Sequence, residues 1–330
     1  MKIIVVGGGG IGTRHLKVLS SFKDVSCSLC EPDPAKLKKA SKDFKIEKTF
    51  NNYDNIDLSK FDAVLICTPP WLHVPQALKA YRAGCHVLTE KPLAMEPEGV
   101  RELIKKVSKK KDKIIGIAYP LRASNSIKRC REIVAGGVIG KVRMAHMQWG
   151  QNILKYRPDF HSLYYADEKR GGGILQDFYP HPLNALEYIL GPEKEIFCVR
   201  EKLGIPGIRT DDSCILVIRY RDDAVLADFA MAIYRSDYFW EMTFVGTEGT
   251  LIWNFSNFLV RRHDKKSDRW FSETFSESWD EFFYRNDRNF INAARGEEKL
   301  NTTIEDGWQT LKTVLSAKKS AQTGKFESVG

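Results

Sequence analysis

The first fifteen residues constrain the fold more than any other stretch of this 330-residue chain. Residues 3–6 form a short apolar run rich in β-branched side chains, which is typical of a strand buried on both faces. The run leads directly into Gly7, Gly9 and Gly12, and a helical pattern follows. Strand, glycine turn and helix in this order predict a dinucleotide-binding turn, although a plain strand-turn-helix corner would use the same glycines.

Each residue of this turn has an expected part in holding a nucleotide. Gly7 permits the tight turn, Gly9 lets the main chain approach a pyrophosphate, and Gly12 lets the helix pack closely on the strand. The N–H groups at the helix start, around Gly10 and Ile11, would bind the phosphates.

A second predicted strand, residues 25–30, ends at Glu31, which lies 19 positions after Gly12. Dinucleotide-binding folds place a carboxylate for the ribose hydroxyls about 20 residues beyond the glycines. Because a carboxylate there repels a 2′-phosphate, the sequence favours NAD over NADP. Lys36 or Lys38 could swing into the same region and favour NADP.

Strands and helices continue to alternate through the first third of the chain. Strand patterns at residues 48–53, 63–67, 87–89 and 114–118 are interleaved with helical patterns at residues 34–42, 73–82 and 97–109. This order predicts a parallel, doubly wound sheet, whose ligands bind beyond the carboxyl ends of the strands. Thr68, Pro69, Glu90, Lys91 and Tyr119 would then share one rim with the glycine turn.

The pattern changes beyond residue 121. Strand patterns follow one another with short turns between them, at residues 141–149, 214–220, 225–234, 239–245, 250–253 and 259–262, and helical patterns lie at residues 126–135, 279–294 and 304–320. Adjacent strands joined by tight turns indicate an antiparallel sheet. We therefore predict an α/β domain over residues 1–121 and an α+β domain over residues 122–330.

Composition argues against several other classes of protein. Hydrophobic residues make up 43% and charged residues 28%, as in globular proteins. No apolar run approaches the roughly 18 residues of a membrane span, and the sequence begins with a strand instead of an export signal. The seven scattered cysteines fit core residues of a reducing compartment better than zinc ligands. We expect a cytoplasmic protein with no metal and no membrane partner.

The net charge of +9 is concentrated partly in one run of lysines, at positions 105, 106, 109, 110, 111 and 113. A basic run of this kind can bind nucleic acid. It can equally be a solvated helix end, where cations face the negative end of the helix dipole. The sequence favours the second interpretation, and we predict no nucleic-acid partner.

Five short motifs are spread over nearly the whole chain: the glycine turn with His15; Cys67-Thr68-Pro69 with His73; Glu90-Lys91-Pro92-Leu93; Gly171-Gly172-Gly173 followed by Asp177 and His181; and Glu305-Asp306-Gly307. Together they resemble the glucose–fructose oxidoreductase / inositol dehydrogenase (Gfo/Idh/MocA) family. The resemblance implies an N-terminal Rossmann domain, a C-terminal open antiparallel sheet, and NAD(P)-dependent oxidation or reduction of sugars, polyols or related compounds. It also implies dimers or tetramers that pack through that sheet.

The resemblance implies catalytic roles for Lys91, Asp177 and His181. Oxidation of a secondary alcohol needs a base for the hydroxyl proton and a positive charge for the developing alkoxide. Lys91 would supply the charge, although a surface lysine paired with Glu90 is the alternative from the residues alone. His181 would accept the proton, because imidazole titrates near neutral pH, and Asp177 would orient it or share the substrate hydroxyl.

The geometry of Asp177 and His181 stays open at this point. Residues four apart share a face of a regular helix, but Pro180 and Pro182 flank the histidine and disturb that simple picture. Asn184 stands where an acid is often found in the family, which bears on substrate choice.

The remaining candidates bind the cofactor or the substrate. The cofactor set is Gly7, Gly9, Gly10, Ile11, Gly12, Glu31, Thr68, Pro69, His73, Glu90 and Lys91. The substrate set is Lys91, Tyr119, Arg122, Tyr156, Arg157, Asp177 and His181. Aromatic faces and forked donors suit a sugar ring or a carboxylate, and ordinary packing beneath a loop is the alternative for residues 156–164.

The predicted function is hydride transfer between NAD(P) and a secondary alcohol or ketone of a sugar, cyclitol or sugar derivative. Two alternatives remain open. One is an NAD-dependent enzyme that cleaves a glycosidic bond through transient oxidation, and the other is a non-catalytic nucleotide-binding regulator. Accumulation of NADH with turnover would argue against the first alternative, and the presence of Lys91, Asp177 and His181 argues against the second.

Overall fold

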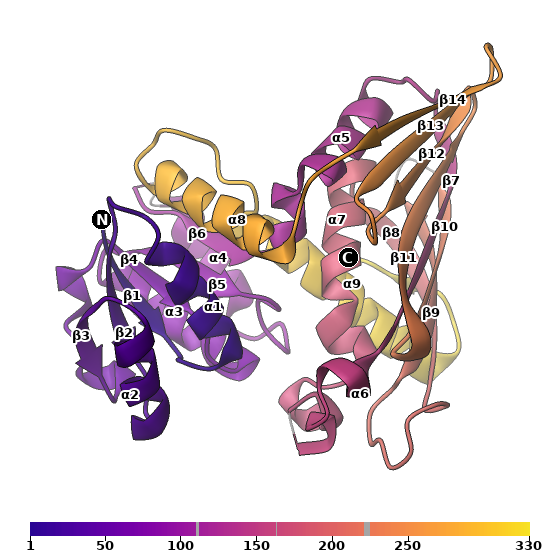
Figure 1. Ribbon diagram of the computed structural model, residues 1–330. Coiled ribbons are helices and arrows are strands. Elements are labelled where there is room, and N and C mark those ends of the chain that lie inside the picture. Colours follow the sequence, from indigo (N-terminus) through magenta and orange to yellow (C-terminus); the bar gives the residue numbers. More distant parts are fainter. Residues whose placement is uncertain (110–111, 163, 221–224) are drawn as a thin grey trace. The chain divides into compact units, whose positions relative to one another are not determined.

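The computed structural model describes residues 1–109, 112–162, 164–220 and 225–330 (Figure 1). By its contacts the chain divides into two compact units. Unit 1 comprises Met1–Ala123 and Ser278–Trp308, and unit 2 comprises Ser124–Glu277 and Gln309–Gly330. The predicted boundary at residue 121 falls close to the end of the first segment of unit 1. Lys110 and Lys111 of the basic run lie outside the described residues.

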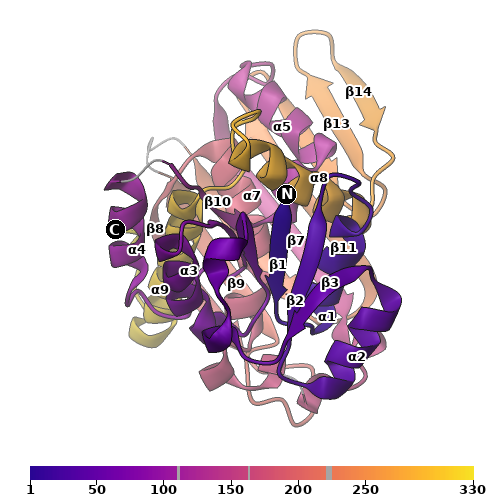
Figure 2. The same ribbon diagram turned by 90° about the vertical axis from the view of Figure 1, so that its left-hand side faces the viewer.

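Unit 1 is built on a six-stranded parallel sheet. Its strands are β1 (Lys2–Val6), β2 (Ser26–Cys30), β3 (Ile46–Phe50), β4 (Ala63–Ile66), β5 (His86–Glu90) and β6 (Ile115–Ala118). Their order is β3-β2-β1-β4-β5-β6, and Figure 2 shows β3, β2 and β1 side by side. All residues of β4, β5 and β6 are buried, as expected for strands covered on both faces. The predicted doubly wound sheet is confirmed.

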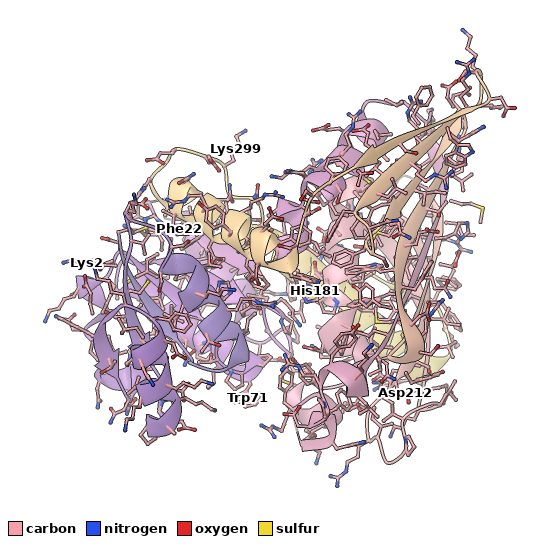
Figure 3. All side chains as sticks on the ribbon, viewed as in Figure 1. Lys2, Phe22, Trp71, His181, Asp212 and Lys299 are labelled. Carbon is pink, nitrogen blue, oxygen red and sulfur yellow. The ribbon has the colours of Figure 1, made fainter. Side chains whose placement is uncertain are left out.

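The helices of unit 1 include one from the distant end of the sequence. Four helices alternate with the strands: α1 (Gly10–Leu19), α2 (Pro34–Asp43), α3 (His73–Arg82) and α4 (Val100–Lys109). The fifth, α8 (Trp279–Ala294), buries Phe283, Phe290 and Ile291 in the same apolar cluster as β1 and α1. The ring of Phe22, labelled in Figure 3, lies edge-on to that of Tyr284 with centroids 4.9 Å apart.

Unit 2 is built on a nine-stranded sheet in the order β14-β13-β12-β11-β7-β10-β9-β8-β15. The strands are β7 (Val142–Asn152), β8 (Glu193–Glu201), β9 (Ser213–Tyr220), β10 (Leu226–Ala232), β11 (Tyr234–Gly246), β12 (Gly249–Asn254), β13 (Leu259–Asp264), β14 (Arg269–Thr274) and β15 (Glu327–Ser328). One correction to the prediction is needed, because β10 pairs with β7 in parallel while every other pair is antiparallel. The sequence analysis also did not predict β8, β14 and β15.

Helices line one face of this sheet. They are α5 (Asn125–Ala135), α7 (Pro180–Leu190) and α9 (Ile304–Thr323), which begins in unit 1, whereas the short α6 (Ile153–Tyr156) directly follows β7. Figure 1 shows α5, α7 and α9 along the same side of the strands. In β9, Cys214, Leu216 and Ile218 are buried, whereas Ile215 between them is 52% exposed. This alternation confirms the predicted sheet with one open face.

Short turns of 3₁₀ helix connect many of these elements, at Tyr53–Asn55, Leu58–Lys60, Pro70–Leu72, Pro120–Ala123, Phe160–Ser162, Tyr164–Ala166 and Glu168–Arg170. All seven cysteines are free and buried. Burial raises the pKa of Cys27 to about 12 and that of Cys30 to about 11, so both thiols stay protonated core groups. In the described part of the chain no helix is long and apolar enough to span a bilayer, and no group of three or more His, Cys, Asp or Glu side chains is arranged so that it could hold a metal ion.

Candidate nucleotide site and candidate catalytic residues

The glycine turn after β1 has the geometry that a pyrophosphate site requires. Gly7 has a φ of 101°, and a Cβ at Gly12 would lie 1.9 Å from the carbonyl oxygen of Gly7, so no larger residue fits there. A Cβ at Gly9 or Gly10 would meet no atom within 4 Å. Gly9 is the N-cap of α1 and makes no side-chain hydrogen bond to it, so no side chain of the cap competes with a phosphate for the N–H groups of the first helical turn.

A pocket of about 590 Å³ lies over this turn, within unit 1. It is lined by Gly8, Gly9, Gly10, Thr13, Arg14, Lys17, Lys36, Lys39, Ala40, Asp43, Phe44 and Asp280. The four cations of this lining suit a diphosphate. The sequence analysis missed Arg14, Lys17 and Lys39. The spacing of the cations could have revealed them. Arg14 and Lys17 on α1, like Lys36 and Lys39 on α2, are three residues apart, which puts each pair on one face of its helix.

The carboxylate of Glu31 is fixed directly beside the turn. Its Oε2 accepts the N–H of Gly8 at 2.5 Å and its Oε1 accepts the N–H of Asp33 at 2.9 Å. The side chain is buried at the end of β2, and a Cβ at Gly8 would lie 3.2 Å from the carboxylate. The structure therefore places this acid next to the glycines, and its contact with the ribose hydroxyls stays a prediction. Lys36 lines the pocket, whereas Lys38 is not among its lining residues.

His73 holds two strand ends together. Its Nε2 lies 2.7 Å from the carbonyl oxygen of Thr68, after β4, and its Nδ1 lies 2.8 Å from that of Pro92, after β5. The ring is fully buried, and burial lowers the pKa of His73. The Thr68 hydroxyl bonds to the amide oxygen of Gln76 at 2.6 Å, while Pro69 is exposed. Both ring nitrogens of His73, one of the predicted cofactor residues, therefore lie within hydrogen-bond distance of main-chain carbonyl oxygens.

Lys91 follows the last residue of β5 and is half-buried. The Oε2 atom of Glu90 accepts the main-chain N–H of Lys91 at 3.0 Å, and its Oε1 lies 2.9 Å from Nε2 of His15. The peptide bond between Lys91 and Pro92 is cis. The carboxylate of Glu90 is therefore engaged by the main chain of Lys91 and by a buried imidazole.

Tyr119 and Arg122 lie just beyond β6, and both are buried. The Nη1 atom of Arg122 lies 2.9 Å from Oδ1 of Asp306, so this guanidinium forms an ion pair inside unit 1. Trp71, in contrast, is 44% exposed and is visible at the surface of unit 1 in Figure 3.

In unit 2, Asp177 lies on a single turn of π-helix, Ile174–Phe178, that follows the three glycines. The N–H of Tyr179 closes this turn by bonding to the carbonyl of Ile174 at 3.0 Å. Gly173, at the start of the turn, has a φ of 95°, and a Cβ there would lie 2.3 Å from the carboxylate of Asp211. Turns of π-helix inside helices occur frequently at functional sites.

Asp177 is bonded to an aromatic hydroxyl. The hydroxyl of Tyr164 donates to Oδ1 of Asp177 at 3.0 Å, and the carboxylate is buried. Burial, followed by the charge of Asp177, raises the pKa of Tyr164, so the tyrosine remains a neutral donor. The sequence analysis covered Tyr164 only as part of residues 156–164 and did not connect it with Asp177, because no local pattern links positions 13 apart.

His181 lies in the first turn of α7 and is half-buried (Figure 3). The helix begins at Pro180, so Pro180 and Pro182 both fall where the N–H groups of a helix have no partner in any case. The flanking prolines are thus compatible with a histidine on this turn. Asn184, one turn along, is buried and its amide donates to Thr310 at 3.0 Å.

Residues 156–164, which precede the three glycines at 171–173, include both exposed side chains that could bind a substrate and buried side chains that pack in the core. Tyr156 is 54% exposed and Arg157 is exposed, whereas Phe160 is buried and stacks on Tyr165 with centroids 6.1 Å apart. Packing therefore accounts for Phe160, and a binding role remains open to Tyr156 and Arg157.

Two family models match the chain. Residues 1–119 match the model described as "Oxidoreductase family, NAD-binding Rossmann fold", and residues 127–252 match the GFO/IDH/MocA C-terminal domain. The myo-inositol 2-dehydrogenase of Thermotoga maritima is 27% identical over 335 aligned positions, which cover 98% of this chain and 96% of the relative. The 1,5-anhydro-D-fructose reductase of Ensifer adhaerens is 28% identical over 81% of this chain and 80% of the relative.

Solved structures share the fold over the full length. The levoglucosan dehydrogenase complex with NADH and levoglucosan superposes with a TM-score of 0.90 at 18% identity, covering 100% of this chain and 99% of that chain. The scyllo-inositol dehydrogenase of Lactobacillus casei with NAD(H) and scyllo-inositol has a TM-score of 0.85 at 20% identity, with the same coverage.

Proposed function

This chain belongs to the Gfo/Idh/MocA oxidoreductase family, and on that premise we propose that it transfers a hydride between NAD and a secondary alcohol of a sugar, cyclitol or sugar derivative. The observation that carries the proposal is a match over 98% of the chain to an inositol dehydrogenase, in a protein that has Lys91, Asp177 and His181 at the expected motif positions.

We assign the chemistry to three side chains. The Lys91 ammonium stabilises the negative charge that develops on the alcohol oxygen. The imidazole of His181 accepts the hydroxyl proton, since a histidine is the side chain best matched to proton transfer near neutral pH. The carboxylate of Asp177, held by the Tyr164 hydroxyl, orients the imidazole or the substrate hydroxyl. When bound, NAD supplies the hydride acceptor.

The residues around the glycine turn fit NAD. We propose that Gly9, Gly10 and Ile11 hold the pyrophosphate and that Glu31 accepts the ribose hydroxyls. The main-chain N–H groups of Gly8 and Asp33 hold the Glu31 carboxylate in place. A 2′-phosphate on the ribose would therefore be repelled by a fixed negative charge.

NAD(H) is expected to bind 10- to 100-fold more tightly than NADP(H), a difference of roughly 1.4–2.7 kcal/mol. Titration calorimetry with both nucleotides measures the ratio. In Glu31→Gln the ratio should shrink, because the repelling charge is gone, whereas Glu47→Gln, an exposed acid on β3, should leave it unchanged. Equal affinities in the parent protein would contradict this assignment.

A turnover screen tests the activity itself. We expect steady accumulation of NADH when the protein and NAD are mixed with one or more of myo-inositol, scyllo-inositol, levoglucosan and a panel of sugars. The reverse reaction is followed with 1,5-anhydro-D-fructose and NADH. Cleavage of a glycoside without net NADH would support the glycoside-cleaving alternative instead. Tight NAD binding with no turnover of any compound would support the regulator.

We also propose a homodimer or homotetramer that packs through the open face of the nine-stranded sheet. Four large apolar side chains on this face are 41–52% exposed, and the register places them on four adjacent strands: Met144 opposite Leu226, and Ile215 opposite Val199. The two pairs lie four positions apart along the sheet, since Leu226 is opposite Arg219 and Ile215 is opposite Ala230. Large apolar side chains exposed on one sheet face support the proposal that a second copy covers them.

A further inference from the structure

Three ionisable side chains in the interior of unit 1 form one continuous hydrogen-bonded chain that the proposed mechanism does not use. The Nδ1 atom of His15 lies 2.8 Å from Oδ2 of Asp287, and its Nε2 lies 2.9 Å from Oε1 of Glu90. His15 is on α1, Glu90 ends β5, and Asp287 is on α8. His15 and Asp287 are 0% exposed and Glu90 is 6% exposed.

Both nitrogens of His15 face carboxylate oxygens, which only accept hydrogen bonds, so the geometry suits an imidazolium that donates twice. Burial alone would disfavour the cation. The charge and hydrogen bond of Asp287, followed by those of Glu90, outweigh that penalty and raise the pKa of His15 to about 10. The stabilisation from this charge is fully present below pH 6.5 and is lost as the pH rises through about 10.

Few other groups face this imidazolium. The ring of Phe283 on α8 meets it edge-on at 5.1 Å, and the amide of Asn286 donates to the second oxygen of Asp287 at 3.2 Å. Two nearby groups feel the same carboxylates: burial raises the pKa of the Cys67 thiol and lowers that of His73. The side chains that bond to the two ring nitrogens of His15 are the carboxylates of Asp287 and Glu90.

The chain of hydrogen bonds ends at Lys91. The Oε2 atom of Glu90, the one that His15 does not contact, accepts the main-chain N–H of Lys91 at 3.0 Å. On the other side of Lys91, the ring of His73 contacts the carbonyl of Pro92 at 2.8 Å. Two buried imidazoles therefore hold the main chain around Lys91. His73 contacts the carbonyl of Pro92 directly, and His15 acts through the carboxylate of Glu90.

We propose that Asp287 and His15 are positioning residues for Lys91: they hold the Glu90 carboxylate in the one orientation that fixes the main chain of Lys91. This inference rests on the function proposed above for Lys91. Removing the negative charge of Asp287 leaves His15 without the group that keeps it charged, and a neutral ring cannot donate to Asp287 and Glu90 together. The Glu90 carboxylate then faces a neutral ring in place of a cation, its hydrogen bond to His15 loses the assistance of that charge, and its hold on the main chain of Lys91 weakens.

Positioning matters because a shift of about 1 Å in a catalytic group can cost about 100-fold in rate. A merely structural role would instead lower stability without affecting Lys91. The two roles are separated by Asp287→Asn, which keeps the shape of the side chain, and by a matched control, Phe290→Leu. Phe290 is buried on the same helix in the same core cluster, but it has no part in the hydrogen-bonded chain.

The first measurement does not depend on activity. Amide hydrogen exchange of the peptide that contains Lys91 is followed by mass spectrometry in the parent, Asp287→Asn and Phe290→Leu. We expect exchange at Lys91 to speed up at least tenfold in Asp287→Asn and to match the parent in Phe290→Leu once the loss of global stability is taken into account. Unchanged exchange in Asp287→Asn overturns the proposal, whether or not the protein oxidises any compound in the screen.

The second measurement is the single-turnover rate of hydride transfer with NAD and the best compound of the screen, beginning with myo-inositol. We expect Asp287→Asn to be about 10- to 100-fold slower than the parent at pH 8. The deficit should shrink toward pH 6, where His15 regains its proton, while NAD affinity stays within about threefold. Phe290→Leu should show a pH-independent ratio close to one.

The outcomes separate the two proposals. If the parent transfers no hydride to any compound, the proposed function fails, and faster exchange at Lys91 in Asp287→Asn still supports the hold on its main chain. If the parent is active and Asp287→Asn transfers hydride at the parent rate at every pH, the positioning role is overturned while the proposed function stands.

Discussion

Replacing His181 with Ala is expected to lower the rate of hydride transfer by about 10²–10⁴-fold, the usual cost of losing a general base. The side chain lies in the first turn of α7 and is half-buried, and it belongs to unit 2. NAD affinity should stay close to that of the parent, because the glycine turn and Glu31 belong to unit 1. Stopped-flow measurement of NADH formation and a separate NAD titration give both values.

The pH dependence makes this prediction sharper. In the parent the rate should change across the neutral range, where an imidazole changes charge, and in His181→Ala this change should disappear. His263→Ala is the matched control, since His263 is paired with Asp268 on the β13–β14 hairpin. Parent-like transfer by His181→Ala from pH 6 to 9 would show that another group takes the proton, and Tyr119 would be the next candidate.

Lys91→Ala is expected to reduce hydride transfer by about 10²–10³-fold, the range measured when one group that stabilises a developing oxyanion is removed. The loss should appear in the rate of the chemical step at saturating substrate, because the ammonium interacts more strongly with the alkoxide-like oxygen than with the neutral alcohol. Weaker NAD binding is also expected, because Lys91 follows β5 on the same strand-end rim as the glycine turn. Single-turnover kinetics and calorimetry separate the two effects.

Lys113→Ala is the control for Lys91→Ala. It removes the same positive charge from the same unit, but Lys113 lies at the other end of β5, where its Nζ is 3.2 Å from Nε2 of His86. Its rate should match that of the parent. If Lys91→Ala also kept the parental rate, the lysine would have no catalytic part, and its motif would serve only to shape the turn.

Local patterns in the sequence determined most of the architecture. Two kinds of pattern act within a few residues: the unbroken apolar runs of β1 and β4, and the glycines that follow β1. They can therefore be interpreted without knowledge of the fold. The position of Glu31 could also be predicted locally, because it follows from the number of residues that separate this acid from Gly12 along the sequence. Strand β14 escaped prediction because all of its residues are exposed and its side chains do not alternate in polarity.

Only the tertiary structure decided which distant groups meet. The helical pattern of residues 279–294 does not reveal that α8 packs in unit 1, since an amphipathic helix covers whichever apolar surface the chain brings to it. His15 meets Glu90 across 75 positions and Asp287 across 272. Such contacts leave no periodic trace, because side chains far apart in sequence are joined by packing alone. The glycine turn thus marks where a nucleotide binds, whereas what holds Lys91 in place depends on the folded core.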